Sequence, residues 1–589
     1  MKAWSNDLWE GKSKIIIGVD VGSTHSGVSY AYLFAGGSRF VTRVSEWPGQ
    51  EAHKTASKIP TMIWYDQNGV AQSFGAETLI PDVMDQALDE GWQLAKHFKL
   101  HLHPTTIITR HTLQLDPLPE GVQLLKIYTD FLAYLLSHTI SAFKSRVVDG
   151  TRVWDQLAST KAVEFVLAHP NGWGLSQQAF LRKAAIRAGY VEDEAQAALR
   201  IRFVSEGEAS VHFCGSTVDT TSYIVKSSYP MLELEEAKAS DCVQAGAIFV
   251  DSAFEKYLRE QLNKTGPSGK ATLTEDDVED FVKRGLSDFE GSAKRAYCGA
   301  EGSKYAIDIG AGRYTDEQKG IRRGRMTIDG DVFHRCFDPF VTQIVRAVEE
   351  QMSGLVTEHV LLVGGFGESP YLREVLRSRF EGGRGRCKVM TANDATAKAV
   401  SDGAVIYHAT QTVKARACRF QFGIVGGIPY DENVPEHRSR DWVIGRDGVK
   451  WMSNKWYPMV ERGDVIMAED GVSENMYNVY HTSNPSLGTF SERIYAFTLS
   501  DEEGPYWALD PDGKPEYGIE CVCEITADLS NLRGGLVEKI SREQGGKYWL
   551  LDYNVVIEFG DTELRAYLEW TENGETKRGQ ASLIPDSFM

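Results

Sequence analysis

The chain has 589 residues, a formal net charge of -19 and 42% hydrophobic residues, which is the composition of an ordinary folded protein of roughly two to four domains. This acidic balance argues against binding to nucleic acids or anionic membranes, because both require a basic surface. The sequence has no apolar run of the roughly 18 residues that a membrane helix needs, and its first residues lack the apolar segment of a signal peptide. We therefore expect a cytoplasmic protein with neither nucleic-acid nor membrane partners.

The first part of the chain alternates predicted strands and helices. Residues 14–20 and 27–34 predict two strands of a hairpin around a glycine turn. Residues 120–143 carry apolar side chains at helical spacing and predict a long amphipathic helix. The next predicted elements are a strand at 162–170, a helix at 175–190 and a strand at 201–209. This alternation indicates an α/β domain with a mixed sheet.

The second part of the chain also alternates predicted strands and helices, up to about residue 409. Helices are predicted at 245–264, 275–298, 334–353 and 392–409. Residues 359–380 predict a fully buried strand, a double-glycine turn and a helix. Beyond residue 410 the chain has short alternating runs rich in Trp, Tyr, Gly and Asp, which predict a β-rich region of about 180 residues.

The first candidate binding motif is Gly22-Ser23-Thr24, which follows a predicted buried strand that ends in Asp20. Such a turn exposes successive N–H groups and two hydroxyls, which suits a phosphate, and an aspartate before it can hold a hydrated Mg²⁺ ion. One such turn alone is explained equally well as a simple turn. A second Gly-Ser-Thr at 215–217 and a Val-Gly-Gly turn at 363–365 favour two lobes that close on a nucleotide.

Taken together, these segments resemble the actin-like ATPase superfamily and, within it, the heat shock protein 70 family, in its divergent, truncated branch that is common in fungi. The resemblance covers about residues 14–408. It implies an α/β, two-lobed actin-like ATPase fold with duplicated mixed-sheet lobes, followed by a β-rich C-terminal region. The implied divisions are a tail at 1–12, a first lobe at 13–213, a second lobe at 214–408 and a C-terminal domain at 409–589.

The resemblance also implies a nucleotide site with ATP or ADP and Mg²⁺ as ligands. The residues implied at the phosphates are Gly22, Ser23, Thr24, Gly215, Ser216 and Thr217. Those implied on the adenosine side are Lys294, Arg295, Gly364, Gly365 and Asp394. The implied catalytic residues are Asp20, which also takes the metal, Glu206, Asp219 and Lys99, with Lys96 as the alternative lysine. Plainer interpretations exist, such as Glu206 capping a helix and Lys294 with Arg295 forming a solvated helix face.

The second copy of the phosphate loop departs from the family pattern. Phe213 occupies the position that Asp20 holds in the first copy, and the strand that should precede Gly215 is missing, a loss of about 20 residues. Because a missing carboxylate weakens metal placement and hydrolysis more than nucleotide contact, we expect ATP binding with impaired hydrolysis. The missing strand also predicts either a rearranged second lobe or a sequence that lacks a segment of the intact protein.

Three functions compete at this point. The leading one is an ATP-binding protein of the heat shock protein 70 type with chaperone-like activity. The second is a catalytically inactive actin-like fold that engages protein clients or partners through its C-terminal region. The third is a small-molecule kinase of the sugar type, which would need a carboxylate base that we do not find in the sequence.

Overall fold

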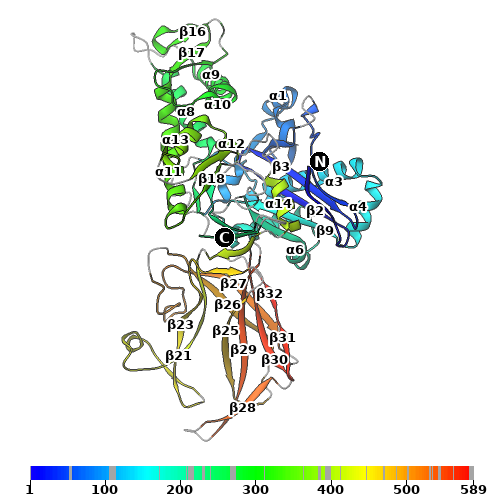
Figure 1. Ribbon diagram of the computed structural model, residues 1–589, viewed down its shortest axis with the longest axis vertical. Helices are drawn as coiled ribbons and strands as arrows, with labels where there is room; N and C mark the ends of the chain where they lie inside the picture. The colour runs from blue at the N-terminus through cyan, green and yellow to red at the C-terminus, as the bar shows by residue number, and fades with distance from the viewer. Residues whose placement is uncertain are drawn as a thin grey trace.

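The computed structural model describes the chain from residue 2 to residue 582, with gaps. The residues outside the description are 1, 52–55, 105–114, 171–172, 207–208, 210–217, 228–232, 239–240, 244, 265–272, 311, 313, 363, 383–386, 392–399, 411–412, 419, 446, 468–470, 484, 486, 500–502, 530–531, 533–534, 542–545, 561–562 and 583–589. We call the elements from β1 to β10 the first lobe, those from β11 to β19 the second lobe, and those from β21 to β32 the C-terminal β-region. Figure 1 shows the two lobes beside each other and the β-region below them.

The first lobe is built on a seven-stranded sheet in the order β1-β4-β3-β2-β9-β10, with β5 paired to β3. Its central strand β2 pairs parallel with β9, which pairs parallel with β10, whereas β3 is antiparallel to β2. The strands are β1 (Lys2–Leu8), β2 (Lys14–Asp20), β3 (His25–Leu33), β4 (Ser38–Arg43), β5 (Lys58–Pro60), β9 (Val163–His169) and β10 (Ile201–Ser205). The strands predicted from apolar runs are therefore confirmed, and the last ends at Ser205, earlier than expected.

Helices cover both faces of this sheet, which explains why β2 reads as a continuous apolar run. On one face lie α3 (Leu124–Arg146), α4 (Gly150–Ser159) and α5 (Leu175–Arg187), and α6 (Glu194–Arg200) precedes β10. On the other face lies α14 (Val400–Thr410), which comes from far along the sequence. Gly18 permits this approach, because a Cβ there would stand 2.3 Å from the Ser401 carbonyl oxygen.

A smaller sheet extends the first lobe toward the second. It is formed by β6 (Met62–Tyr65), β7 (Ala71–Phe74) and β8 (Gln93–Lys96). Two short 3-10 helices and one α-helix accompany it, namely η2 (Gly75–Leu79), α1 (Pro81–Asp89) and η3 (Phe98–Leu102). The helix η3 carries one of the predicted site lysines.

The second lobe has a helical core with short strands at its margins. Its helices are α8 (Ala247–Leu262), α9 (Glu275–Asp288), α11 (Gly330–Met352) and α13 (Pro370–Phe380). A π-helical turn η4 (Phe289–Ala293) joins α9 to α10 (Lys294–Ala296), so the predicted helix at 275–298 is one nearly continuous element. The three long helices predicted for this part are confirmed.

The strands of the second lobe are divided among small sheets. β11 (Val218–Thr220) pairs with β14 (Asp241–Val243), β18 (His359–Leu362) pairs with β19 (Lys388–Thr391), and β15 (Lys304–Asp308) forms a three-stranded sheet with β16 (Ile321–Arg322) and β17 (Arg325–Asp329). The prediction of a fully buried strand at the start of 359–380 is wrong, because the residues of β18 alternate between exposed and half-buried. The following glycines form a short helix α12 (Gly364–Gly367) rather than an open turn.

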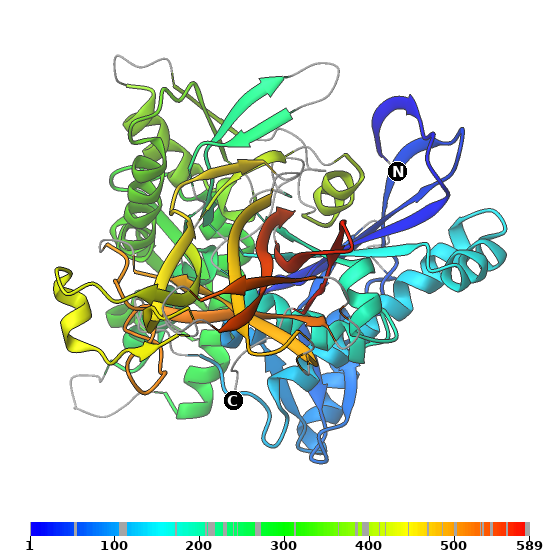
Figure 2. The ribbon, with the colours of Figure 1, turned by 90° about the horizontal axis from the view of Figure 1, so that it is seen from below.

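The C-terminal β-region confirms the predicted β-rich texture. A six-stranded sheet contains β22 (Val443–Ile444), β23 (Lys450–Val460), β21 (Gln421–Pro429), β26 (Thr489–Phe497), β27 (Ile519–Asp528) and β32 (Gln580–Ser582). A five-stranded sheet contains β25 (Gly471–Tyr480), β28 (Leu536–Ile540), β29 (Lys547–Gly560), β30 (Glu563–Glu572) and β31 (Glu575–Arg578). Their strands pack around one shared apolar core, and Figure 2 shows this region from below.

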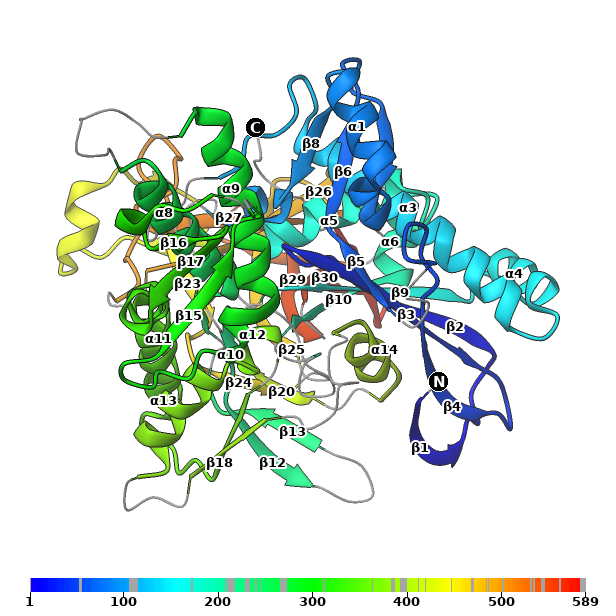
Figure 3. The same ribbon diagram turned by 90° about the horizontal axis from the view of Figure 1, so that it is seen from above.

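A four-stranded sheet joins the lobes to the β-region. It consists of β12 (Tyr223–Ser227), β13 (Glu233–Glu236), β20 (Val413–Ala417) and β24 (Val465–Met467), and Figure 3 shows the β12–β13 hairpin beside β20. The buried Glu236 carboxylate accepts a hydrogen bond from the Ala417 N–H at 3.1 Å. None of the helices in the described part of the chain is long and apolar enough to span a membrane.

Candidate functional site

The predicted first-lobe residues meet at one edge of the large sheet. β2, β9 and β10 run parallel, so their carboxyl ends lie at this edge and are followed by Val21, Pro170 and Glu206. Asp20 stands opposite Ala168, and His169 stands opposite Ser205. Two strand spacings therefore place Asp20 and Glu206 about 10 Å apart across β9. Ligands of α/β sheets bind in crevices outside this type of edge.

The loop Gly22-Ser23-Thr24 connects β2 to β3 at the same edge. Gly22 is buried, Ser23 is half-buried and Thr24 is exposed. The Thr24 carbonyl oxygen accepts a hydrogen bond from the Thr61 N–H at 2.8 Å, which fixes the loop. No group among the described residues accepts a hydrogen bond from the N–H of Gly22, Ser23 or Thr24. Successive unsatisfied N–H groups of this kind form a cradle for an anion.

Asp20 lies directly before this loop and is already paired with a cation. Its side chain is 2% exposed, and its Oδ2 atom lies 2.9 Å from the Lys58 Nζ atom. Lys58 opens β5, which pairs with the opposite side of β3. The ion pair therefore spans three strands, and it neutralises the carboxylate that the sequence assigned to the metal.

A second buried ion pair joins Lys99 to Glu206. Lys99 comes from η3 and Glu206 follows β10, and their side chains are 2% and 3% exposed. The Lys99 ammonium also lies 5.7 Å from the centre of the Trp173 ring. Lys96, the alternative lysine, instead pairs with Asp116 at 3.1 Å. The structure thus brings together Lys99 and Glu206, two of the four predicted catalytic residues.

Aromatic and imidazole groups enclose this ion pair. The Trp173 Nε1–H donates to His103 Nδ1 at 3.1 Å, so that nitrogen carries no proton. Burial and, to a smaller extent, the Lys99 charge together lower the pKa of His103 to about 4. Burial also raises the pKa of the Tyr128 hydroxyl well above its usual value, and the Glu206 charge adds to this rise. The environment therefore keeps both groups neutral.

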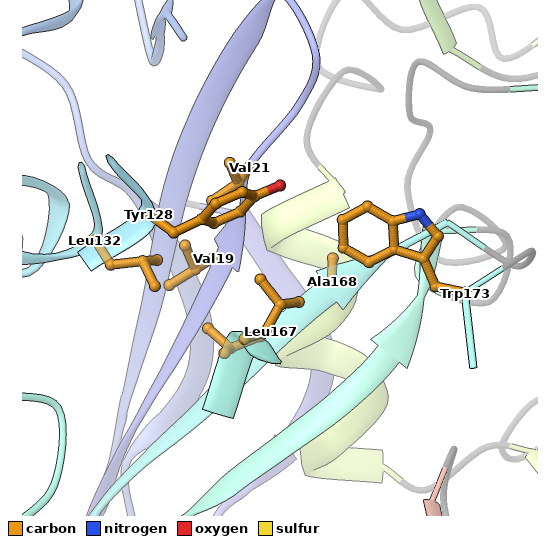
Figure 4. Close-up of a pocket in the computed structure, with 8 residues that line it drawn as sticks. Val19, Val21, Tyr128, Leu132, Leu167, Ala168 and Trp173 are labelled. Atoms are coloured by element: carbon orange, nitrogen blue, oxygen red, sulfur yellow. The ribbon is translucent and has the colours of Figure 1, made fainter. Parts of the chain in front are cut away.

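Beneath the sheet edge lies a small apolar cavity of about 10 Å³. It is lined by Val19, Val21, Tyr128, Leu132, Leu167, Ala168, Trp173 and Leu181, and Figure 4 shows the Tyr128 and Trp173 rings over the ends of β2 and β9. The buried Tyr128 hydroxyl has no hydrogen-bond partner among the described residues. The space is about that of one water molecule, so a larger ligand has to bind outside it, above the loop.

The second-lobe basic pair divides into a half-buried residue, Lys294, and an exposed one, Arg295. Lys294 Nζ lies 2.6 Å from Asp251 Oδ1 and donates to the Ala247 carbonyl oxygen at 3.0 Å. Burial raises the pKa of Asp251 to about 6, although the Lys294 charge opposes the rise. The exposed Arg295 donates to the Glu290 carbonyl oxygen at 3.2 Å. Lys294 is therefore satisfied within its own lobe, while Arg295 lies at the surface.

The two segments predicted on the adenosine side are neighbours in the structure. Tyr297, just after Lys294 and Arg295, packs on Phe337 with ring centres 5.0 Å apart. Phe337 in turn packs on Phe366, which follows Gly364 and Gly365 in α12, at 6.2 Å. One aromatic cluster thus connects η4 to α12, as an adenosine site shared by these segments requires.

Small electrostatic effects of first-lobe residues reach acidic side chains of the second lobe. Burial raises the pKa of Asp251, and His97 opposes this rise only slightly. The hydrogen bond with Arg259 is the main cause of the lowered pKa of Glu279, to which Lys96 adds a small contribution. His97 itself is held by Asp116, whose Oδ2 lies 2.7 Å from its Nδ1. The segment that carries Lys99 therefore lies close to the helix that carries Asp251.

Part of the predicted site lies outside the described residues. This applies to Gly215, Ser216, Thr217 and Asp394. Asp219 is in β11, where its backbone pairs with Cys242 of β14. The position of the second phosphate loop relative to Asp20 and Glu206 therefore lies outside the structural description.

Sequence reasoning missed three residues of this site: Lys58, His103 and Trp173. The pairing of Lys58 with Asp20 depends on the register of β5 against β3, which no local pattern reveals. His103 follows the 3-10 helix η3, and Trp173 lies four residues after the end of β9. The motif "AHPNGWG" at the end of this parallel strand could have indicated Trp173 as a site residue.

The acidic residues at this edge, Asp20 and Glu206, do not form a usual site for Mg²⁺. Mg²⁺ is usually held through one or two carboxylates, phosphate oxygens and water. Within the part of the chain that the structure describes, no three acidic, histidine or cysteine side chains gather at one point. Asp20 and Glu206 are each paired with a lysine, so this arrangement fits an incoming anion better than a divalent cation.

Two lobes, with a glycine loop and buried acids at the carboxyl edge of the first, followed by a β-rich region, define the actin-like fold class that the sequence predicted. The chain is similar to heat shock 70 kDa protein 12A of mouse, with 21% identity over 94% of this chain and 89% of the relative. It is similar to the human protein of the same name with 22% identity and the same coverage. These matches confirm the resemblance to the heat shock protein 70 family. No protein-family model matches the chain.

Proposed function

We propose that the chain binds an adenine nucleotide, ATP or ADP, at the carboxyl edge of the first-lobe sheet. The phosphates lie over the N–H groups of Gly22, Ser23 and Thr24, and the Lys99 ammonium approaches them from η3. The adenosine extends toward the cluster of η4 and α12 in the second lobe. The observation that carries this proposal is the open N–H cradle beside two lysine–carboxylate pairs, of which Lys99–Glu206 is fully buried and Lys58–Asp20 is partly exposed at the lysine.

Hydrolysis is slow in this proposal. Phosphoryl transfer depends on positioned metal ions and on a group that orients the attacking water. Here the Glu206 carboxylate, the natural candidate for that group, is held by Lys99, and Asp20 is held by Lys58. The protein therefore acts as a nucleotide-dependent binding protein of the heat shock protein 70 type, located in the cytoplasm, rather than as a fast ATPase.

Thermal unfolding of the full chain with ATP, ADP and AMP tests the proposal. A ligand that binds only the folded state stabilises it by about 2.7 kcal/mol at a hundredfold excess over Kd. ATP and ADP should raise the Tm and AMP should have little effect, because the cradle recognises the terminal phosphates. A cooperatively folded chain whose Tm does not respond to ATP contradicts the proposal.

We also propose the division of the chain into a tail at 1–12, lobes at 13–213 and 214–408, and a C-terminal domain at 409–589. The three main apolar cores support this division, because each draws its residues almost entirely from one of the three larger segments. The packing of α14 on the first-lobe sheet crosses the division and holds the lobes together. Limited proteolysis should therefore cut near residue 409 before it separates the lobes.

Binding of unfolded protein segments is a second candidate function, and it belongs to the C-terminal β-region. The edge strand β22 exposes Val443 and Ile444 by 69% and 60%, and Trp442 before it by 40%. Adjacent exposed apolar residues at a sheet edge suit an extended partner. The test is suppression of aggregation of a denatured model protein, measured by light scattering. Val443→Glu with Ile444→Glu should abolish suppression and leave ATP binding unchanged.

A further inference from the structure

The Asp20 carboxylate forms an ion pair with the Lys58 ammonium. The register of three neighbouring strands places the two residues beside each other. Asp20 pairs with Gly27 in β3, and Gly27 pairs with Lys58 in β5, so the three residues lie in one row across the strands. Gly27 has no side chain, and the Lys58 stem crosses over it. A Cβ on Gly27 would lie 3.5 Å from Lys58 Cγ and 3.9 Å from Lys58 Cε. The stem therefore passes along the glycine to reach Asp20.

The segment that carries Lys58 is anchored to the phosphate loop at several points. The Gln50 side-chain amide donates to the Lys58 carbonyl oxygen at 3.0 Å. Three residues further on, the Thr61 hydroxyl lies 2.8 Å from the Ser26 hydroxyl in a buried contact. The Thr61 N–H donates a hydrogen bond to the Thr24 carbonyl oxygen. These contacts hold Lys58 beside the loop that follows Asp20.

The two members of the pair differ in exposure. The Lys58 side chain is 25% exposed, whereas that of Asp20 is 2% exposed. Solvent therefore reaches the pair at Lys58, whereas the carboxylate is closed off. A cation entering from solvent has to displace Lys58 before it can touch Asp20.

We propose that Lys58 takes the place of the divalent cation at this site, so that the cradle binds metal-free nucleoside diphosphates and triphosphates. The inference rests on the proposed nucleotide-binding function and deepens it. Lys58 neutralises Asp20 and donates to a phosphate oxygen, while Lys99 supplies a second positive charge near Glu206. Magnesium is then not required for affinity, because N–H donors of the cradle and of Lys58 contact the phosphate oxygens that the metal would otherwise coordinate.

The first experiment measures the binding of ADP to the full chain by calorimetry, in Mg²⁺ and in EDTA. The wild type should bind with Kd values within about threefold of each other, whereas Lys58→Met should lose about tenfold or more in EDTA, as expected for a lost charge-assisted hydrogen bond. Lys14→Met is the matched control, because Lys14 pairs with Glu164 at the other end of β2 at 2.9 Å and is 23% exposed. It should bind ADP like the wild type.

The second experiment needs no nucleotide. Mg²⁺ alone should raise the Tm of Lys58→Met, which leaves the Asp20 carboxylate open to the ion, and should not raise the Tm of the wild type or Lys14→Met. Wild-type binding of ADP that is lost in EDTA, or a wild-type Tm that responds to Mg²⁺ like that of Lys58→Met, overturns the inference while the proposed function stands. Absence of ADP binding in both buffers overturns the proposed function, and the Mg²⁺ response still decides whether Lys58 occupies the cation position.

Discussion

The two lobes of this protein carry similar Gly-Ser-Thr motifs, but their described strands form very different sheets. The first lobe has a continuous seven-stranded sheet whose carboxyl edge carries Asp20, the loop after it and Glu206. In the second lobe the described strands form separate pairs and a triplet, and helices supply most of the core. A phosphate site needs several strand ends held in register. Among the described residues the first lobe provides such an edge, which is why we propose the phosphate site there and assign the helices of the second lobe to its wall.

The largest expected effect concerns the buried ion pair of the first lobe. Lys99→Met removes the cation from Glu206 in a place where both side chains are almost fully buried. Removing one partner of a buried pair typically destabilises by about 3–5 kcal/mol, and we expect about 4 kcal/mol in urea unfolding. The double variant Lys99→Met with Glu206→Gln should recover part of this loss. A single variant as stable as the wild type would show that the pair is not buried.

The contact between β2 and α14 gives the next largest effect. Gly18→Ala places a Cβ 2.3 Å from the Ser401 carbonyl oxygen, so the helix or the strand must shift. Overpacking of this kind costs typically 1–3 kcal/mol, and we expect about 3 kcal/mol because the obstructing atom belongs to the backbone. The control is Gly291→Ala in the second lobe, where nothing lies within 4 Å of the added Cβ. Equal stability of the two variants would refute the close approach.

Acidification should weaken the first lobe through His103. Its folded pKa of about 4 lies below the ordinary value of 6.5, so between these values the unfolded chain binds the extra proton. Stability contributed by the neutral ring is present above pH 6.5 and is lost as the pH falls toward 4. The loss should reach about 2 kcal/mol by about pH 5. His103→Gln should show a flatter dependence of unfolding free energy on pH, and an unchanged slope would contradict the assignment.

The smallest effect belongs to the corresponding ion pair of the second lobe. Lys294→Met removes the partner of Asp251, whose side chain is 13% exposed. Burial already raises the pKa of Asp251 to about 6, so the carboxyl can take up a proton rather than remain charged. We expect a loss of about 1 kcal/mol at neutral pH that shrinks on acidification. A loss as large as that of Lys99→Met would remove the contrast between the lobes.

The sequence predicted the elements that depend on local patterns. The apolar run at 14–20 and the helical spacing at 120–143 correspond to β2 and α3, and Asp20 ends β2 as predicted. Glu206, which lay inside the strand predicted at 201–209, instead follows the end of β10 at Ser205. The prediction for β18 failed because burial depends on what covers a strand, and within the described residues β18 pairs only with β19. Lys58 was missed because it lies 38 residues from Asp20, and only the register of three strands brings them together.

Calorimetric titration of ATP into the full chain and into Ser23→Asp tests the central claim most directly. The substitution places a carboxylate in the N–H cradle, and Ser159→Asp makes the same change at an exposed helix end. We expect one ATP site in the wild type and in Ser159→Asp, and no measurable heat of binding in Ser23→Asp. ATP binding to Ser23→Asp with wild-type affinity would contradict this claim, because the phosphates would then lie elsewhere.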